Sequence, residues 1–244
     1  MEVFSQELSV IIDQLYDQQH QNIREAARLC AQAITAGGVI QVLGSGHSVG
    51  FGWEMANRPG SLVPVHSLNM DDFVTKGKFS FEEYKDPINI FERRPGIAEQ
   101  FYNLYDIRLA DIFIIISNSG INGVVIDMAI QAKEKGHQLI VVTSWQHTSA
   151  EDSRHPSGKK LYEFADLVID NCGPKGDALI ETGGIEKICS ISSITGAIIA
   201  QTIGSETCEF LIAANQQVPI LWPETRPGYL EHNNKLKNAY LGRI

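Results

Sequence analysis

Short, uninterrupted runs of β-branched and other apolar residues recur along this chain. The clearest is residues 111–116 (DIFIII), and further strands are predicted at residues 39–43, 62–66, 139–142 and 167–169. Strands that are apolar at every position, separated by segments of helical periodicity, are typical of a parallel sheet with both faces covered. We therefore expect a doubly wound α/β fold, with a mainly parallel five-stranded sheet and long flanking helices.

The remaining segments fit one domain around this sheet. Residues 1–36 carry apolar side chains at gaps of three and four, and Gly37 and Gly38 end this predicted helix. The sheet core is expected over residues 37–184, and C-terminal helices over 185–244, the first of them at about 185–214. A stretch without clear period, residues 70–96, is predicted to be a long irregular insertion. A length of 244 residues without linker or repeat predicts a single domain, 1–244.

Charge and cysteine usage exclude several function classes. The chain has 20 Lys and Arg against 29 Asp and Glu, a net charge of −9, and its basic residues are scattered. This argues against nucleic-acid binding, which requires basic stripes. The N-terminus lacks the pattern of a signal peptide, and no apolar run suits a membrane span, so we expect no membrane partner and a cytoplasmic protein. The four cysteines show no close pairing, which predicts neither a metal site nor disulfides.

Small polar residues follow three of the predicted strands. The loops are GSGHS after the first, SNSGIN after the central one, and TS after the next. The carboxyl ends of parallel strands meet at one edge of a sheet, where ligands bind. Backbone N–H groups at the start of the helix after SNSGIN would face the same edge, so we predict an anion site. Its candidate residues are Ser45, Gly46, Ser48, Ser117, Asn118, Ser119, Gly120, Asn122, Thr143 and Ser144.

Two other interpretations of these loops remain open. Gly44 and Gly46 match the start of a dinucleotide fingerprint, but Val49 stands at its third glycine position. SNSGIN also suits a tight strand-to-helix turn in which Ser119 or Asn122 is the N-cap. A phosphate site accounts for more of the residues, because two hydroxyl donors and a glycine that allows close approach occur together.

At this point the sequence resembles the sugar isomerase (SIS) domain family. The resemblance rests on the long first helix, GSGHS, SNSGIN and TS, and it covers nearly the whole chain. The longer stretches GSGHSVGFGWEMANRPG and SRHPSGKKLYEFADLVIDNCGPKGDA resemble an uncharacterised single-domain subgroup that is expected to bind phosphosugars. The resemblance implies a flavodoxin-like SIS fold, a phosphate held by the Ser-x-Ser-Gly loop, a homodimer or homotetramer, and no cofactor. Asn122 departs from the Ser or Thr of many SIS loops.

Catalytic candidates follow from the same resemblance. The chain is similar to phosphoheptose isomerases, which place a catalytic glutamate in the helix after the first glycine loop, where Glu54 stands here. Glu54 also suits an ion pair with Arg58, four residues on. The family's histidine on the final long helix is missing, and Glu206 is an acid near that place. His47 in the first loop and His155 in SRHPSGK are further catalytic candidates, although both also suit structural roles.

These features predict a phosphosugar-binding protein. The first hypothesis is an enzyme of carbohydrate-derivative metabolism, either a sugar-phosphate isomerase or an amino-sugar-phosphate lyase or etherase. An isomerase needs a base that moves a proton between neighbouring carbons. The alternative is a non-catalytic phosphosugar sensor that acts through a protein partner.

Overall fold

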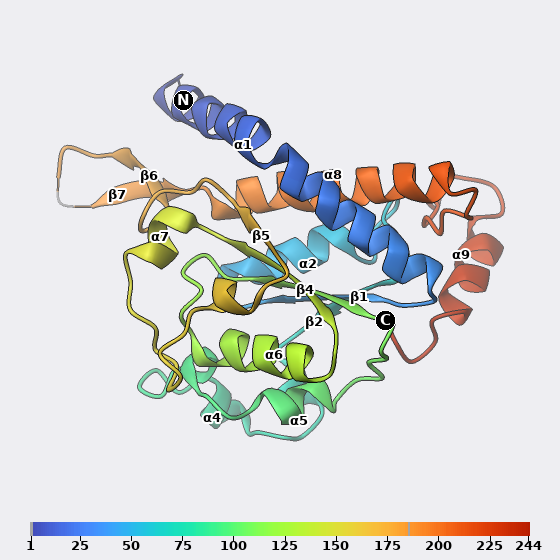
Figure 1. Cartoon of the computed structure of the whole chain (residues 1–244), viewed down its shortest axis with the longest axis horizontal. Coiled ribbons are helices and arrows are strands. Elements are labelled where there is room, and N and C mark those ends of the chain that lie inside the picture. Colours follow the sequence, from blue (N-terminus) through green and yellow to red (C-terminus); the bar gives the residue numbers. More distant parts are fainter. Residues whose placement is uncertain (1, 185) are drawn as a thin grey trace.

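Five parallel strands form the central sheet, in the order β2-β1-β3-β4-β5 (Figure 1). The computed structural model describes residues 2–184 and 186–244. The five strands are β1 (Ile40–Gly44), β2 (Val65–Leu68), β3 (Ile112–Ile116), β4 (Gln138–Thr143) and β5 (Leu167–Asp170). The predicted five-stranded parallel α/β fold is confirmed. The second strand begins later than expected, because Leu62 instead forms an antiparallel bridge with Ile220.

Helices cover both faces of the sheet (Figure 1). One face carries α1 (Glu2–Thr35), α2 (Val49–Met55) and α8 (Ser192–Ala213), where both α1 and α2 contact α8. The other face carries α5 (Ala98–Tyr102) and α6 (Gly123–Glu134). Successive residues of each strand point to opposite faces, so Ile112 and Ile114 pack toward α1 and α8 while Phe113 and Ile115 pack toward α6. This two-sided burial is why β3 is apolar at every position.

The predicted irregular insertion contains short helical turns. They are α3 (Asp72–Thr75), α4 (Phe81–Tyr84) and the 3₁₀ turn η2 (Phe91–Arg93). Phe73, Phe79, Phe91 and Phe101 pack ring against ring and hold this segment onto the face of the sheet covered by α6. Aromatic packing therefore replaces the hydrophobic periodicity that the insertion lacks.

The start of the C-terminal region differs from the prediction. Residues 187–190 do not belong to a helix: β7 (Lys187–Ser190) pairs antiparallel with β6 (Ala178–Glu181) in a hairpin that projects from the body (Figure 1). Residue 185, where the helix was expected to begin, lies outside the described residues. The carboxylate of Asp177 accepts hydrogen bonds from the backbone N–H groups of Ile191 and Ser192, at distances of 3.2 and 2.8 Å. This carboxylate caps α8 and fixes its start after the hairpin. The tail ends in α9 (Tyr229–Asn238).

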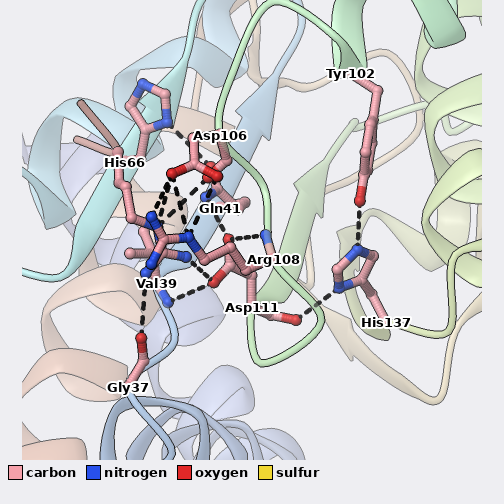
Figure 2. A network of polar contacts seen from close by, with 10 residues as sticks. Gly37, Val39, Gln41, His66, Tyr102, Asp106, Arg108, Asp111 and His137 are labelled. Carbon is pink, nitrogen blue, oxygen red and sulfur yellow. Dashed lines mark hydrogen bonds and ion pairs between the residues drawn. The ribbon is translucent and has the colours of Figure 1, made fainter. Parts of the chain in front are cut away.

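The amino edge of the sheet is closed by a buried polar network (Figure 2). The Asp111 carboxylate accepts hydrogen bonds from Val39 N at 2.9 Å and Gln41 Nε2 at 2.9 Å, and it pairs with the guanidinium of Arg243. Arg243 also donates to the carbonyl oxygen of Gly37 at 3.1 Å. The penultimate residue of the chain thereby fastens the C-terminal segment beside the first strand.

The topology leaves the opposite edge free for a site. From β1 the chain passes to β2 on one side and later to β3 on the other, so the strand order reverses between β1 and β3. Ligands of open α/β sheets bind outside the carboxyl ends of the strands at such a point. The GSGHS and SNSGIN loops follow these two strands.

Candidate functional site

The loop after β1 is a tight turn that leads into α2. Residues Gly46–Ser48 form the 3₁₀ turn η1, and α2 follows directly. A Cβ atom on Gly44 would lie 2.2 Å from the carbonyl oxygen of Ser48, so only glycine allows the backbone to close here. The turn itself therefore requires Gly44, and a dinucleotide-binding role is not needed to explain this glycine. His47 and Ser48 are carried outward on the turn, and neither side chain has a hydrogen-bond partner among the described residues.

Several of the predicted binding hydroxyls stabilise the loops instead. Ser117 Oγ accepts a hydrogen bond from Gly120 N at 3.1 Å, inside the SNSGIN turn. Thr143 Oγ1 donates to the carbonyl oxygen of Asn118 at 3.1 Å. Ser144 Oγ donates to Gly173 O at 2.7 Å and caps the short helix α7 (Trp145–Ser149). These three side chains are buried and position the loops against one another.

A second group of hydroxyls has no partner within the described residues. It consists of Ser45, Ser48 and Ser119, each partly exposed. Asn122 is the N-cap residue of α6, yet its side chain does not cap the helix. Its Nδ2 donates to Glu92 Oε1 at 3.2 Å, and its Oδ1 accepts from Arg154 at 2.9 Å. The amino end of α6 thus lacks a side-chain cap and lies beside free hydroxyl groups, which suits an anion.

A cavity of about 170 Å³ lies at the carboxyl edge of the sheet, and we call it the Glu54 cavity. Three of the predicted binding or catalytic residues line it with Glu54, namely His47, Ser48 and Asn118. Asn171 after β5, and Ser192 and Ser193 at the start of α8, complete its polar wall. Loops from β1, β3 and β5 therefore meet here with a helix that follows far later in the sequence.

Two side chains hold the Glu54 carboxylate in place. Arg58, one turn further along, forms an ion pair with Glu54, as the spacing of four residues allows. Gln201 on α8 donates from Nε2 to Glu54 Oε2 at 3.0 Å and to its carbonyl oxygen at 3.1 Å. The side chain of Glu54 is 35% exposed. A carboxylate at the wall of a cavity can accept a proton from a bound ligand.

His155 does not line the Glu54 cavity. Its Nε2 is 2.8 Å from Asp127 Oδ1 on α6, and its Nδ1 is 2.7 Å from Ser157 Oγ. These bonds fasten the loop of residues 153–160 to α6. Glu206 also does not line this cavity. Its carboxylate is 3.5 Å from the guanidinium of Arg24 on α1, without a well-directed hydrogen bond.

A larger cavity of about 310 Å³ lies on the other side of the β1 loop, and we call it the insertion cavity. Gly46 lines it from the loop, Trp53 from α2, and Tyr84 and Glu92 from the insertion. Burial raises the pKa of Tyr84 above its ordinary value, and the nearby carboxylates of Asp71 and Glu92 raise it further. The phenol therefore stays protonated.

Metal and thiol chemistry have little support among the described residues. No group of three or more His, Cys, Asp or Glu side chains in that part of the chain could hold a metal ion. Cys172, beside Asn171, has its pKa raised to about 12 by burial, so it is a protonated thiol and a poor nucleophile. No helix of residues 2–184 and 186–244 is long and apolar enough to cross a membrane.

The sequence carries no signal for Gln201 and only weak signals for Asn171 and Glu92, all of which approach from distant segments. Gln201 belongs to the apolar stretch of α8, where nothing in the pattern separates it from a solvated residue. Glu92 and Arg154 come from an insertion and a loop without period. Asn171 had the better signal, because it directly follows the last strand of the sheet, at the same edge as the glycine loops.

Known proteins share this architecture and sequence. A UPF0309 protein of Geobacillus sp. (strain WCH70) is 34% identical over 100% of this chain and 97% of its own length. A UPF0309 protein of Listeria innocua is 33% identical over 96% of this chain and 93% of its own. Phosphoheptose isomerase from Neisseria gonorrhoeae has the same fold, with a TM-score of 0.55, 16% identity, and coverage of 85% of this chain and 96% of the isomerase.

The enzyme of the same name from Francisella tularensis superposes with a TM-score of 0.54 at 15% identity, covering 85% of this chain and 95% of that one. The SIS domain family matches residues 3–144, which include the first four strands of the sheet and both glycine loops. On this match and the full-length similarity, the chain belongs to the SIS domain family, among the UPF0309 proteins.

Proposed function

We propose that this chain binds a sugar phosphate and moves a proton on it, as an isomerase or as a lyase or etherase. SIS domains bind carbohydrate derivatives, and membership of that family supports the ligand class. The observation that carries the proposal is the Glu54 cavity, where a carboxylate meets polar side chains from three strand ends. It combines a proton acceptor with groups that bind hydroxyls.

The phosphate is assigned to the amino end of α6. Ser45, Ser119 and the uncapped first turn of α6 offer donors, and the guanidinium of Arg154 adds positive charge beside Asn122. Backbone N–H groups, the helix dipole and hydroxyls together bind a dianion without a basic surface patch. This arrangement fits an acidic protein.

In this proposal Glu54 is the base. An isomerase takes a proton from the carbon next to a carbonyl, which gives an enediol, and returns a proton to the neighbouring carbon. Arg58 and Gln201 hold the carboxylate in position. In an elimination, the same carboxylate takes the proton while the substituent on the next carbon leaves as its conjugate base.

The first experiment separates ligand binding from turnover. Sugar phosphates that raise the Tm are tested for conversion by the unmodified protein and by Glu54→Gln, which keeps an acceptor for Gln201. We expect Glu54→Gln to lower kcat by about 10²- to 10⁴-fold and to leave Kd nearly unchanged. Glu99→Gln, an exposed acid on α5, is the matched control and should keep full activity. Normal turnover by Glu54→Gln would contradict the assignment.

The phosphate assignment has its own test. Ser119→Ala should weaken binding of a sugar phosphate but not of the same sugar without phosphate, because it removes one donor. Ser9→Ala, on the exposed surface of α1, should leave both Kd values unchanged. If the unmodified protein binds sugar and sugar phosphate equally, the phosphate site is wrong.

A non-catalytic sensor is the second candidate. One observation favours it: Glu54 already has two partners, Arg58 and Gln201, which a base would have to share with its substrate. Tight binding of a sugar phosphate with no conversion of it by the unmodified protein would support the sensor. A sensor of this kind would act through a protein partner.

We also propose a homodimer or homotetramer. The amino-terminal half of α1 extends beyond the body of the molecule and exposes Val3, Val10 and Tyr16 (Figure 1). A helix that leaves several large apolar side chains in water gains stability from a second copy. Light scattering after size-exclusion chromatography should give a multiple of 27.0 kDa, and a monomer would contradict the proposal.

A further inference from the structure

The β1 loop and α2 contain four glycines in the stretch GSGHSVGFG, and the backbone requires three of them. A Cβ atom on Gly44 would overlap the carbonyl group of Ser48, and one on Gly52 would lie 2.4 Å from Ser67 Oγ. Gly46 has a φ of +55°, in the left-handed region that favours glycine. Each of these positions therefore has a structural reason for its missing side chain.

Gly50, the remaining glycine, has no such reason. It lies in α2 and is not among the residues with a positive φ. A Cβ atom there would have no side chain and no backbone of another described segment within 4 Å. Glycine within a helix is less favourable than alanine, because it loses more backbone freedom on folding. The fold would therefore be more stable with a side chain at this position.

The space left by Gly50 belongs to the Glu54 cavity. His47, Gly50, Phe51 and Glu54 all line this cavity. Their spacing of three and four residues puts them on one face of the helical segment that η1 and α2 form together. Gly50 lies between His47 and Glu54 on that face. Without a side chain there, a ligand can approach the backbone of α2 between these two groups.

The rest of the lining offers both kinds of surface that a sugar needs. Ile116 and Val142, near the carboxyl ends of β3 and β4, are apolar and suit the C–H groups of a sugar. Asn171 uses one of its two amide N–H groups in a bond to Asn118, so the other remains for a hydroxyl. The hydroxyl of Ser193 has no partner within the described part of the chain.

We infer that a bound ligand lies against the backbone of α2 at Gly50, and that the missing side chain sets the size of the group that can reach Glu54. Gly50 is thus a specificity-determining residue. This inference rests on the proposed sugar-phosphate site and assigns a contact to the sugar part of the ligand. Ser119 and Asn122 of the phosphate site do not line this cavity, so a side chain at Gly50 would meet the sugar rather than the phosphate.

Two substitutions at Gly50 separate stability from binding. Gly50→Ala and Gly50→Leu introduce good helix formers, so both variants should unfold at a higher urea concentration than the unmodified protein. Calorimetry measures Kd for ribose 5-phosphate, glucose 6-phosphate, fructose 6-phosphate and glucosamine 6-phosphate. For the ligands that bind, we expect Kd to rise about tenfold in Gly50→Ala and binding to be lost in Gly50→Leu, because the added atoms occupy the space of the sugar.

Gly204→Ala is the matched control. Gly204 lies inside α8, an added Cβ would have no neighbouring atom within 4 Å, and the residue does not line the Glu54 cavity. This variant should also unfold at a higher urea concentration, and it should leave every Kd unchanged.

Four results would overturn the inference. Unchanged Kd values in both Gly50 variants, or an equal rise in the two, would exclude a steric effect, which must grow with the size of the side chain. A lower urea midpoint for Gly50→Ala would show that the fold itself needs this glycine. These three results leave the sugar-phosphate site intact. If the unmodified protein binds none of these sugar phosphates, the inference and the proposed function are both wrong.

Discussion

Glu54 and Glu92 are two half-buried carboxylates on either side of the β1 loop, and their partners suit different roles. Glu54 is ion-paired with Arg58 and accepts a hydrogen bond from Gln201, so two neighbours fix the position of its carboxylate. Glu92 accepts one hydrogen bond from a neutral amide, so its charge is not balanced by a neighbouring cation at that contact.

We expect His137 to make the free energy of unfolding depend on pH. Its side chain is buried, with Nδ1 2.9 Å from Asp111 O, which can only accept, and Nε2 2.7 Å from Tyr102 Oη (Figure 2). Burial lowers the pKa of His137 below its ordinary value. The unfolded chain therefore binds the proton more readily, and the free energy of unfolding should fall as pH drops below about 6.5.

Urea unfolding at a series of pH values checks this expectation. His137→Asn should show a flatter loss of stability below neutral pH than the unmodified protein, although burial also lowers the pKa of His66 and that contribution remains. His20→Asn, at an exposed position on α1, should leave the slope unchanged. Equal slopes for His137→Asn and the unmodified protein would show that His137 is not held neutral by the fold.

At the scale of elements, the amino end of α6 joins the insertion, which has only short helical turns, to the irregular loop of residues 153–160. Asn122 contacts Glu92 of the insertion and Arg154 of the following loop. One turn further, Asp127 accepts from Gly96 N and pairs with His155. Asn122 and Asp127 thus each tie the insertion to the loop, and this explains how residues 90–96 and 153–160 reach the site.

The insertion approaches α6 closely at Gly123. A Cβ there would lie 2.6 Å from the carbonyl oxygen of Arg93, so Gly123→Ala must displace the insertion. We expect a loss of about 1–3 kcal/mol in the free energy of unfolding, and faster amide exchange over residues 90–96. Unfolding curves and hydrogen exchange measure both.

Gly204→Ala is the control for this change. It adds the same methyl group to α8 at a position where that group would have no neighbouring atom within 4 Å. It should raise stability by up to about 1 kcal/mol through helix propensity. Unchanged exchange over residues 90–96 in Gly123→Ala would contradict the role given to this contact.

At the scale of the whole molecule, the site and the closing network lie at opposite edges of the sheet. Asp111 and Arg243 are 132 positions apart in the sequence and nearly inaccessible, at 3% and 4% exposure. Their contact fixes the C-terminal segment across the start of β1 (Figure 2). The carboxyl edge is therefore available for a ligand, while the contacts at the amino edge stabilise the fold.

Arg243→Ala should lower the free energy of unfolding by about 3–5 kcal/mol, because it leaves the Asp111 carboxylate buried without its cation. Arg108→Ala removes an exposed ion pair with Asp106 and should cost less than about 1 kcal/mol. Urea unfolding compares the two. A double variant, Asp111→Asn with Arg243→Met, should recover part of the lost free energy of unfolding. If Arg243→Ala lowers the free energy of unfolding as little as Arg108→Ala does, the role given to this network is wrong.

The sequence by itself determined the five buried strands, their parallel arrangement and the edge at which the glycine loops meet. These features follow from local patterns: strands buried on both faces must be apolar throughout, and Gly44 leaves no room for a side chain. The hairpin of β6 and β7 escaped prediction because its strands are exposed and lack the period of buried ones.

Only the tertiary structure decided which polar residues are available to a ligand. Ser117, Thr143 and Ser144 look like Ser119 in the sequence, yet they bond to loop atoms and Ser119 does not. Gln201 reaches Glu54 from 147 positions away, and Glu92 reaches Asn122 from an insertion without period. Hydrogen-bond partners depend on distances in space, and a local pattern carries no information about side chains that the fold brings together from distant segments.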